Sequence, residues 1–134
     1  MRGLPRMPDH DRAVVICASA ALADGGKGVR FPLITRQGPA TGFAVRFEGR
    51  VHAYLNRCAH LETELDWQLG EFFDHAGLYL ICATHGALYA PESGRCEGGP
   101  CQGRSLLSLA VLEHDSLVYW LPDSPSSQVA TVAD

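Results

Sequence analysis

The chain has little positive charge. Its 134 residues include 11 Lys and Arg against 15 Asp and Glu, the formal net charge is −4, and Lys27 is the only lysine. The sequence contains no cluster of basic residues. Because nucleic-acid-binding proteins neutralise phosphates with Lys and Arg, we expect no nucleic acid as a partner. Mild acidity fits docking on the basic face of another protein, and it equally fits simple solubility.

Long apolar runs are also missing. No stretch approaches the ~20 apolar residues that cross a bilayer, and residues 1–5 lack the apolar segment of a signal peptide. We therefore expect a cytoplasmic protein without a membrane partner. The cysteine count of five is odd, and disulfides are rare in the cytosol. On these grounds Cys17, Cys96 and Cys101 are expected to be reduced.

The sequence lacks sustained helical periodicity, with a weak exception at 61–73. It has instead 14 Gly, 8 Pro and many short apolar runs bounded by turn residues. This pattern predicts an all-β protein, a small antiparallel sandwich or barrel. One domain is expected over 13–121, with flexible termini at 1–12 and 122–134. The expected strands are 13–17, 29–34 (an edge strand because of Pro32), 42–47, 51–55, 77–81, 106–112 and 117–121, with one helical turn near 19–23. Two hairpins are expected, 42–47 with 51–55 across 48–50 and 106–112 with 117–121 across 113–116.

Two of these strands run directly into short motifs that carry metal-binding residues. Cys58 and His60 follow the strand 51–55, and Cys82 and His85 follow the strand 77–81. A structural zinc site usually takes its cysteines as one pair and its histidines as another. Here each motif supplies one thiolate and one imidazole. This arrangement suits a [2Fe–2S] cluster in which two thiolates bind one iron and two imidazoles bind the other.

The surrounding residues extend the pattern. Residues 56–61 and 82–89 resemble the two cluster-binding loops of the Rieske [2Fe-2S] family, and 93–95 with 98–100 resemble the turn and proline loop that follow them. The resemblance implies a β-sandwich or barrel with a small cluster-binding subdomain, whose loops are about 56–64 and 82–100. It also implies that Cys58 and Cys82 bind the inner iron of a Rieske-type cluster, and that His60 and His85 bind the outer one.

Several neighbours of the implied cluster bear on its reduction potential. High-potential members of the family join the two loops by a disulfide, but Thr63 and Thr84 occupy the matching positions here. Ala87 replaces a serine whose hydroxyl faces a bridging sulfide in those members. Both departures imply a soluble ferredoxin type, with a potential below about 0 mV in a range of roughly −150 to +300 mV. Tyr89 matches a tyrosine that donates to a cysteine sulfur; packing beneath the loop is an equally weighted alternative.

Other side chains are assigned simpler roles. An electron must leave at the cluster edge, so we expect an exposed histidine edge within an apolar rim that includes Leu61, Leu88 and Pro100. The segment around Trp67 and Phe72 is expected to form a small accessory core. The remaining histidines follow no ligand spacing and are expected at the surface: they are His10, His52, His75 and His114.

The resemblance implies an electron-transfer protein and not an enzyme. Such a carrier takes one electron from a flavin-containing reductase and passes it to a terminal oxygenase or reductase. The sequence has no nucleotide-binding glycine fingerprint and no room for a second domain with a mononuclear iron site. One alternative is the small Rieske-type subunit of a nitrite reductase. The other is a module without redox activity, either stabilised by zinc or free of metal.

Overall fold

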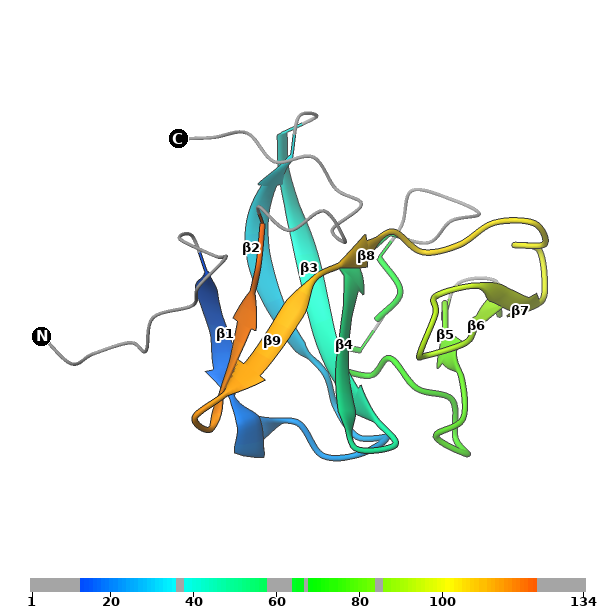
Figure 1. The fold of residues 1–134 in the computed structure, drawn as a ribbon. Helices are drawn as coiled ribbons and strands as arrows, with labels where there is room; N and C mark the ends of the chain where they lie inside the picture. Colours follow the sequence, from blue (N-terminus) through cyan, green and yellow to red (C-terminus); the bar gives the residue numbers. More distant parts are fainter. Residues whose placement is uncertain (1–12, 36–37, 58–63, 67, 84–85, 123–134) are drawn as a thin grey trace, which may run out of the picture.

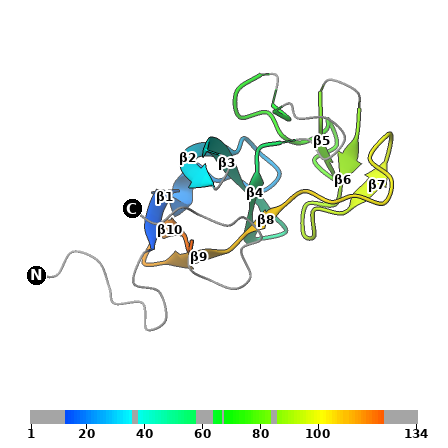
Figure 2. The same cartoon turned by 90° about the horizontal axis from the view of Figure 1, so that it is seen from above.

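Three antiparallel sheets lie side by side in the computed structural model, which describes residues 13–35, 38–57, 64–66, 68–83 and 86–122 (Figure 1). We call them the outer sheet (β1-β10-β9), the central sheet (β2-β3-β4-β8) and the small sheet (β5-β6-β7). Figure 2 shows the central sheet between the other two. The strands are β1 (Val14–Ala18), β2 (Val29–Thr35), β3 (Gly38–Phe47), β4 (Arg50–Leu55), β5 (Leu80–Ile81), β6 (Leu88–Tyr89), β7 (Cys96–Gly98), β8 (Ser108–Leu109), β9 (Val111–His114) and β10 (Leu117–Trp120).

The all-β prediction is confirmed. A single 3-10 turn, Ser19–Ala21, is the only helical element among the described residues, and it lies where one helical turn was expected. Residues 64–66 and 68–73 contain no helix, and the rest of the weakly periodic segment 61–73 lies outside the described residues. No helix in the described ranges is long and apolar enough to span a membrane. The predicted flexible termini fall outside the description except for half-buried Pro122, and the domain limits stay a prediction.

The central sheet separates two hydrophobic cores. Successive side chains of a strand point to opposite faces, and β3 and β4 bury both faces. Phe43 and Tyr54 pack on the side of the small sheet, whereas Ala44 and Ala53 pack on the side of the outer sheet. Phe43 also stacks on Phe72 with ring centroids 3.9 Å apart. The small sheet is therefore attached to the rest of the protein through a shared apolar core.

The two predicted hairpins are present. The first closes at Glu48 and Gly49, and the second closes at Asp115 and Ser116. All four residues have positive φ, from 51° to 83°, which is the conformation that two-residue hairpin turns require. The second turn was expected over 113–116, but β9 continues to His114 and the turn is two residues long.

Two predicted strands were too long. The run 77–81 forms a strand only at Leu80–Ile81. The Asp74 carboxylate accepts hydrogen bonds from the backbone N–H groups of Leu78 and Tyr79 at 3.0 and 3.3 Å. These residues therefore form a turn before β5 and are not part of the strand. The run 106–112 is divided between β8 and β9. In contrast, β2 is an edge strand of the central sheet, as Pro32 indicated.

Candidate metal centre

Cys82 is the predicted ligand that the structure describes. It directly follows β5, it is completely buried, and it takes part in no disulfide. The other predicted ligands, Cys58, His60 and His85, lie outside the described residues. The joint geometry of the four side chains therefore stays a prediction. What can be described is the frame that holds the ends of both loops.

The second loop is closed by backbone hydrogen bonds at its two ends. The Cys82 N–H donates to the Ala87 carbonyl at 2.9 Å, and the Gly86 N–H donates to the Cys82 carbonyl at 2.9 Å. Gly86 has a φ of +74°, which glycine adopts without steric cost. Directly outside this loop, β5 pairs with β6. The loop thus leaves the small sheet at Cys82 and returns to it at Ala87, which fixes the position of the buried thiol.

The ends of the first loop are joined by Asn56. Its Oδ1 atom accepts a hydrogen bond from the Leu65 N–H at 2.9 Å, and its Nδ2 group donates to Asp66 Oδ1 at 2.8 Å. The Leu65 carbonyl then accepts a hydrogen bond from the Ala83 N–H at 3.2 Å. Because Ala83 follows Cys82, one short chain of hydrogen bonds connects the bases of both loops. We call Asn56, Leu65, Asp66 and Ala83 the loop clamp.

Asp66 is the buried anion of the loop clamp. Its second oxygen, Oδ2, accepts a hydrogen bond from the Gly70 N–H at 3.0 Å and lies 3.7 Å from an Arg30 guanidinium nitrogen. Arg30 also pairs with Glu64 at 2.7 Å. A buried carboxylate needs such partners because desolvation is costly. The sequence motif had included Asn56, but nothing in the spacing indicated that Asp66 would be its partner.

The proline loop rests on the second loop. Gly99 has a φ of +84°, and a Cβ atom at this position would lie 3.0 Å from the Gly86 carbonyl oxygen and 3.1 Å from the Ala87 Cα atom. Contacts this short require the neighbouring backbone to shift by a few tenths of an ångström, and the positive φ strains any side chain, so both features favour glycine. Pro100 is exposed next to it, as expected for the rim. Leu88 is half-buried, whereas Leu61 lies outside the described residues.

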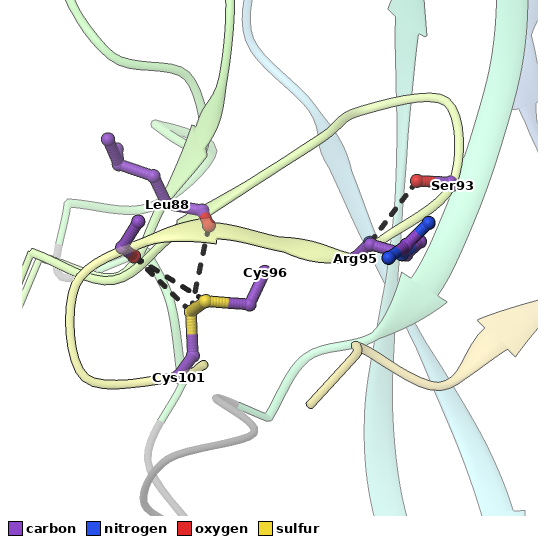
Figure 3. The surroundings of a disulfide bond; sticks show 6 residues. Leu88, Ser93, Arg95, Cys96 and Cys101 are labelled. Atoms are coloured by element: carbon purple, nitrogen blue, oxygen red, sulfur yellow. Dashed lines mark hydrogen bonds between the residues drawn. A yellow bond between two sulfur atoms is a disulfide. The ribbon is translucent and has the colours of Figure 1, made fainter. Parts of the chain in front are cut away.

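The prediction that Cys96 and Cys101 are reduced is wrong. The two residues form a disulfide that spans the proline loop (Figure 3). The prediction relied on the rarity of disulfides in one cellular compartment, which says nothing about the distance between two particular side chains. Cys17, by comparison, is a free, half-buried thiol, as expected. Burial is the main cause that raises the pKa of Cys17.

The predicted neighbours of the cluster are buried beside Cys82. Ala87 and Tyr89 are completely buried in the same apolar core as Cys82 and Cys101. Complete burial is compatible with both roles proposed for Tyr89. The prediction of a small accessory core is wrong for Phe72, which belongs to the same core as Phe43 and Cys82; Trp67 lies outside the described residues. His75 and His114 are exposed as expected, but His52 is half-buried and burial is the main cause that lowers its pKa.

These surroundings fit a [2Fe–2S] cluster. The described donor is a buried thiol at the start of a tight loop, and the residues beside it, Ala83, Gly86 and Gly99, have small or no side chains. Small residues leave room for a bulky inorganic group at the loop. Two Cys and two His are also the donor types that a Rieske centre uses, and the sequences of the two loops contain both types.

The fold resembles solved structures of oxygenase systems. The ferredoxin of carbazole 1,9a-dioxygenase from Nocardioides aromaticivorans IC177 is 20% identical with a TM-score of 0.63, over 83% of this chain and 98% of that chain. A chain from the complex of reduced oxygenase and oxidized ferredoxin in carbazole 1,9a-dioxygenase is 21% identical with a TM-score of 0.62, over 81% and 92%. At this identity the likeness concerns the fold alone.

The terminal oxygenase of carbazole 1,9a-dioxygenase from Novosphingobium sp. KA1 gives a partial match. It is 21% identical with a TM-score of 0.64, over 84% of this chain but only 30% of the oxygenase. A comparison with curated proteins finds no significant relative. The family model of the Rieske [2Fe-2S] domain, however, matches residues 12–124. The chain therefore belongs to the Rieske [2Fe-2S] domain family, and its cofactor is a [2Fe–2S] cluster.

Proposed function

We propose that this protein is a one-electron carrier that takes an electron from a flavin-containing reductase and passes it to a terminal oxygenase or another terminal redox enzyme. One observation supports this most directly. The fold match spans 98% of the carbazole dioxygenase ferredoxin from Nocardioides aromaticivorans IC177 but only 30% of the terminal oxygenase from Novosphingobium sp. KA1. The match therefore includes almost the whole of the ferredoxin but less than a third of the oxygenase. We do not assign it a catalytic activity of its own.

The proposed ligands are Cys58 and Cys82 for the inner iron and His60 and His85 for the outer iron. When bound, such a cluster accepts and returns one electron. The protein contributes a thiol shielded from water, because Cys82 is fully buried in the core between the small and central sheets. Four small or compact residues of the second ligand loop and the proline loop are exposed: Ala83, Gly86, Gly99 and Pro100. This small-residue surface lets a partner approach closely, which electron transfer requires.

The partners are part of the proposal. A reductase and an oxygenase must each dock and leave within one catalytic cycle, which favours small interfaces. We propose no contact with nucleic acid or membranes, because the net charge is −4 and basic clusters are missing from the sequence. A cytoplasmic location also remains a proposal. Its supports are the lack of long apolar runs and of a signal-peptide pattern in the sequence, whereas the reduced Cys96 and Cys101 that it implied are replaced by a disulfide.

Two alternatives differ from the carrier in partner or in metal. The small Rieske-type subunit of a nitrite reductase would use the same cluster with a different partner, and no observation favours it over the carrier. A zinc-stabilised module would use the same four ligands without redox activity. The family match favours iron–sulfur over zinc, and metal analysis separates the two.

The test begins with anaerobically purified protein. We expect a red-brown protein with two irons and two acid-labile sulfides, which is reduced by one electron and reoxidised by a terminal acceptor. A colourless protein with stoichiometric zinc would refute the carrier. His60→Cys should keep a cluster with a lower potential, since an anionic ligand disfavours the added electron. His114→Cys, at an exposed position on β9, is the matched control and should leave the potential unchanged.

A further inference from the structure

The disulfide between Cys96 and Cys101 encloses the tip of the proline loop. Cys96 begins β7 and is half-buried, while Cys101 is completely buried. Between them lie only four residues, 97–100, and two of these are glycines. Glycine loses more conformational freedom than any other residue when it is ordered. The loop tip is thus a segment that needs an external constraint to stay in one conformation.

Backbone hydrogen bonds hold the base of the proline loop, and strand pairing at Gly98 holds one side of its tip. The Cys96 N–H donates to the Arg104 carbonyl at 3.0 Å, and the Arg104 N–H donates to the Cys101 carbonyl at 2.9 Å. At the tip, Gly98 pairs with Leu88 in the small sheet, and Gly99 packs on Gly86 and Ala87.

The disulfide itself touches the strand that follows the second ligand loop. Cys101 Sγ lies 3.6 Å from the Leu88 carbonyl oxygen and 3.4 Å from the Gly98 carbonyl oxygen (Figure 3). In the disulfide form the sulfur carries no proton, so these are packing contacts. The disulfide also shares its apolar core with Cys82 and Ala87, at the two ends of that loop. The Cys96–Cys101 disulfide therefore packs in the same core as the ends of the second ligand loop.

We propose that the Cys96–Cys101 disulfide positions the proline loop against the second ligand loop, and that its reduction to two thiols makes the bound cluster more labile. The proposal rests on the proposed function, because it takes Cys82 as a ligand. Cutting the disulfide frees the two-glycine tip, and Gly86 and Ala87 lose the surface that packs on them. The loop that starts at Cys82 then opens more often, and each opening exposes the cluster to solvent.

The reduction requires a two-electron donor. A dithiol reductant attacks with one thiolate, and half-buried Cys96 offers the more accessible sulfur. A mixed disulfide forms on Cys96 while Cys101 leaves as a thiolate and takes up a proton. The second thiol of the reductant then displaces Cys96, so that the reductant ends as a disulfide and the protein holds two thiols. A [2Fe–2S] cluster transfers one electron at a time and does not replace this donor.

The test compares three cluster-loaded proteins: the wild type, the double variant Cys96→Ser/Cys101→Ser, and Cys17→Ser as a matched control in the outer sheet. Peptide mapping without reduction first checks for the disulfide. Loss of visible absorbance in excess iron chelator then gives the rate of cluster release. We expect release about tenfold faster in the double variant, because even a modest disulfide contribution corresponds to a tenfold change in an opening equilibrium. Cys17→Ser should match the wild type.

A second measurement covers the case in which the double variant folds poorly. The wild type is treated with a phosphine, which converts the disulfide to two thiols and becomes the phosphine oxide with oxygen from water. Release should accelerate to the same extent, and the phosphine should have no effect on the double variant. Equal release rates in all proteins, or no disulfide in the peptide map, overturn the proposal. A wild type without iron and sulfide refutes the proposed function itself, which is a separate result.

Discussion

The Nδ2 atom of Asn56 lies 2.8 Å from the Oδ1 atom of Asp66, and this buried hydrogen bond joins the two ends of the first ligand loop. Asn56 directly follows β4, at the start of the loop, and Asp66 is buried at the end of the loop. The same asparagine accepts the Leu65 N–H, whose own carbonyl accepts the Ala83 N–H. One side chain thus connects the backbones that carry all the proposed ligands.

The first prediction concerns Asp66→Asn. An amide at this position keeps one acceptor oxygen but turns an NH2 group toward either the Gly70 N–H or the Asn56 amide, both of which are donors. A buried donor without an acceptor costs about 1–3 kcal/mol. We expect the free energy of unfolding to fall by that amount in chemical denaturation, together with a lower cluster content. Asp115→Asn, the same change in an exposed turn, is the control; equal effects of both variants would contradict the loop clamp.

The second prediction concerns Gly99→Ala. The added Cβ atom meets the Gly86 carbonyl oxygen at 3.0 Å and the Ala87 Cα atom at 3.1 Å, so the contact between the proline loop and the second ligand loop must widen by a few tenths of an ångström. Overpacking of this kind costs about 1–3 kcal/mol, and the cluster should be released faster. Gly103→Ala is the matched control, because Gly103 has a similar φ of +80° but no atom within 4 Å of the added Cβ. The difference between the two variants measures contact alone, and no difference would mean that the contact is unimportant.

The third prediction concerns the reduction potential and Ala87. The wild-type potential is expected below about 0 mV. Ala87→Ser introduces a hydroxyl at a fully buried position, where it must find an acceptor. If that acceptor is a cluster sulfur, the potential rises by an amount on the order of tens of millivolts, because hydrogen bonds to the sulfurs favour the reduced state. Voltammetry at neutral pH measures the shift. Ala90→Ser, two residues beyond Leu88 and also buried, should leave the potential unchanged.

The fourth prediction separates the two roles of Tyr89. Removing its hydroxyl in Tyr89→Phe keeps the ring that fills the core around Cys82. A lower potential with unchanged stability would assign the hydroxyl to a cysteine sulfur, and an unchanged potential would assign Tyr89 to packing. Tyr119→Phe is the control, because Tyr119 is also completely buried but belongs to a different core cluster with Leu121. Its potential should equal that of the wild type.

The fifth prediction is a pH dependence of stability. Arg46 on β3 pairs with Glu113 on β9 at 2.7 Å and joins the central and outer sheets. The hydrogen bond with Arg46 is the main cause that lowers the pKa of Glu113. A lowered pKa in the folded state adds stability above the unfolded value of roughly 4.3, and this stability is lost as the pH falls through the folded pKa.

Glu113→Gln tests this dependence. Because the pair is partly exposed, we expect the variant to be less stable than the wild type by about 1 kcal/mol or less at pH 7. The two proteins should become equal in strongly acidic solution. Denaturation at several pH values gives the difference, and exposed Glu97→Gln serves as control. A difference that stays constant with pH would show that the ion pair is not its source.

The sequence predicted best where a local rule sufficed. Alternating residues and turn signals located the hairpin of β3 and β4, and Pro32 identified an edge strand. The family resemblance rested on short motifs with fixed spacing, and the family model confirms it. The length of β5 was overestimated because apolar residues at 78–79 look the same in a strand and in an exposed turn. The Asp74 carboxylate accepts the N–H groups of residues 78 and 79 and holds them in a turn, so the strand begins only at Leu80.

Features that depend on distant contacts were not predicted. The hydrogen bond between Asn56 and Asp66 spans ten residues, and no spacing rule relates these two side chains. The Cys96–Cys101 disulfide was not predicted, because the expected cellular compartment does not determine whether the loop between two cysteines brings their sulfurs together. In both cases tertiary packing, and not local preference, decides which groups meet.

The two-sided burial of β3 bears on how the protein loses its structure. Phe43 and Val45 support the core under the small sheet, while Ala44, between them, supports the core under the outer sheet. Because β3 contributes side chains to both cores, loss of its packing in one core also weakens its packing in the other. Damage at the ligand loops should therefore spread through β3 into the remainder of the fold, so that proteolysis of metal-depleted protein yields short peptides instead of a trimmed, stable β-sandwich.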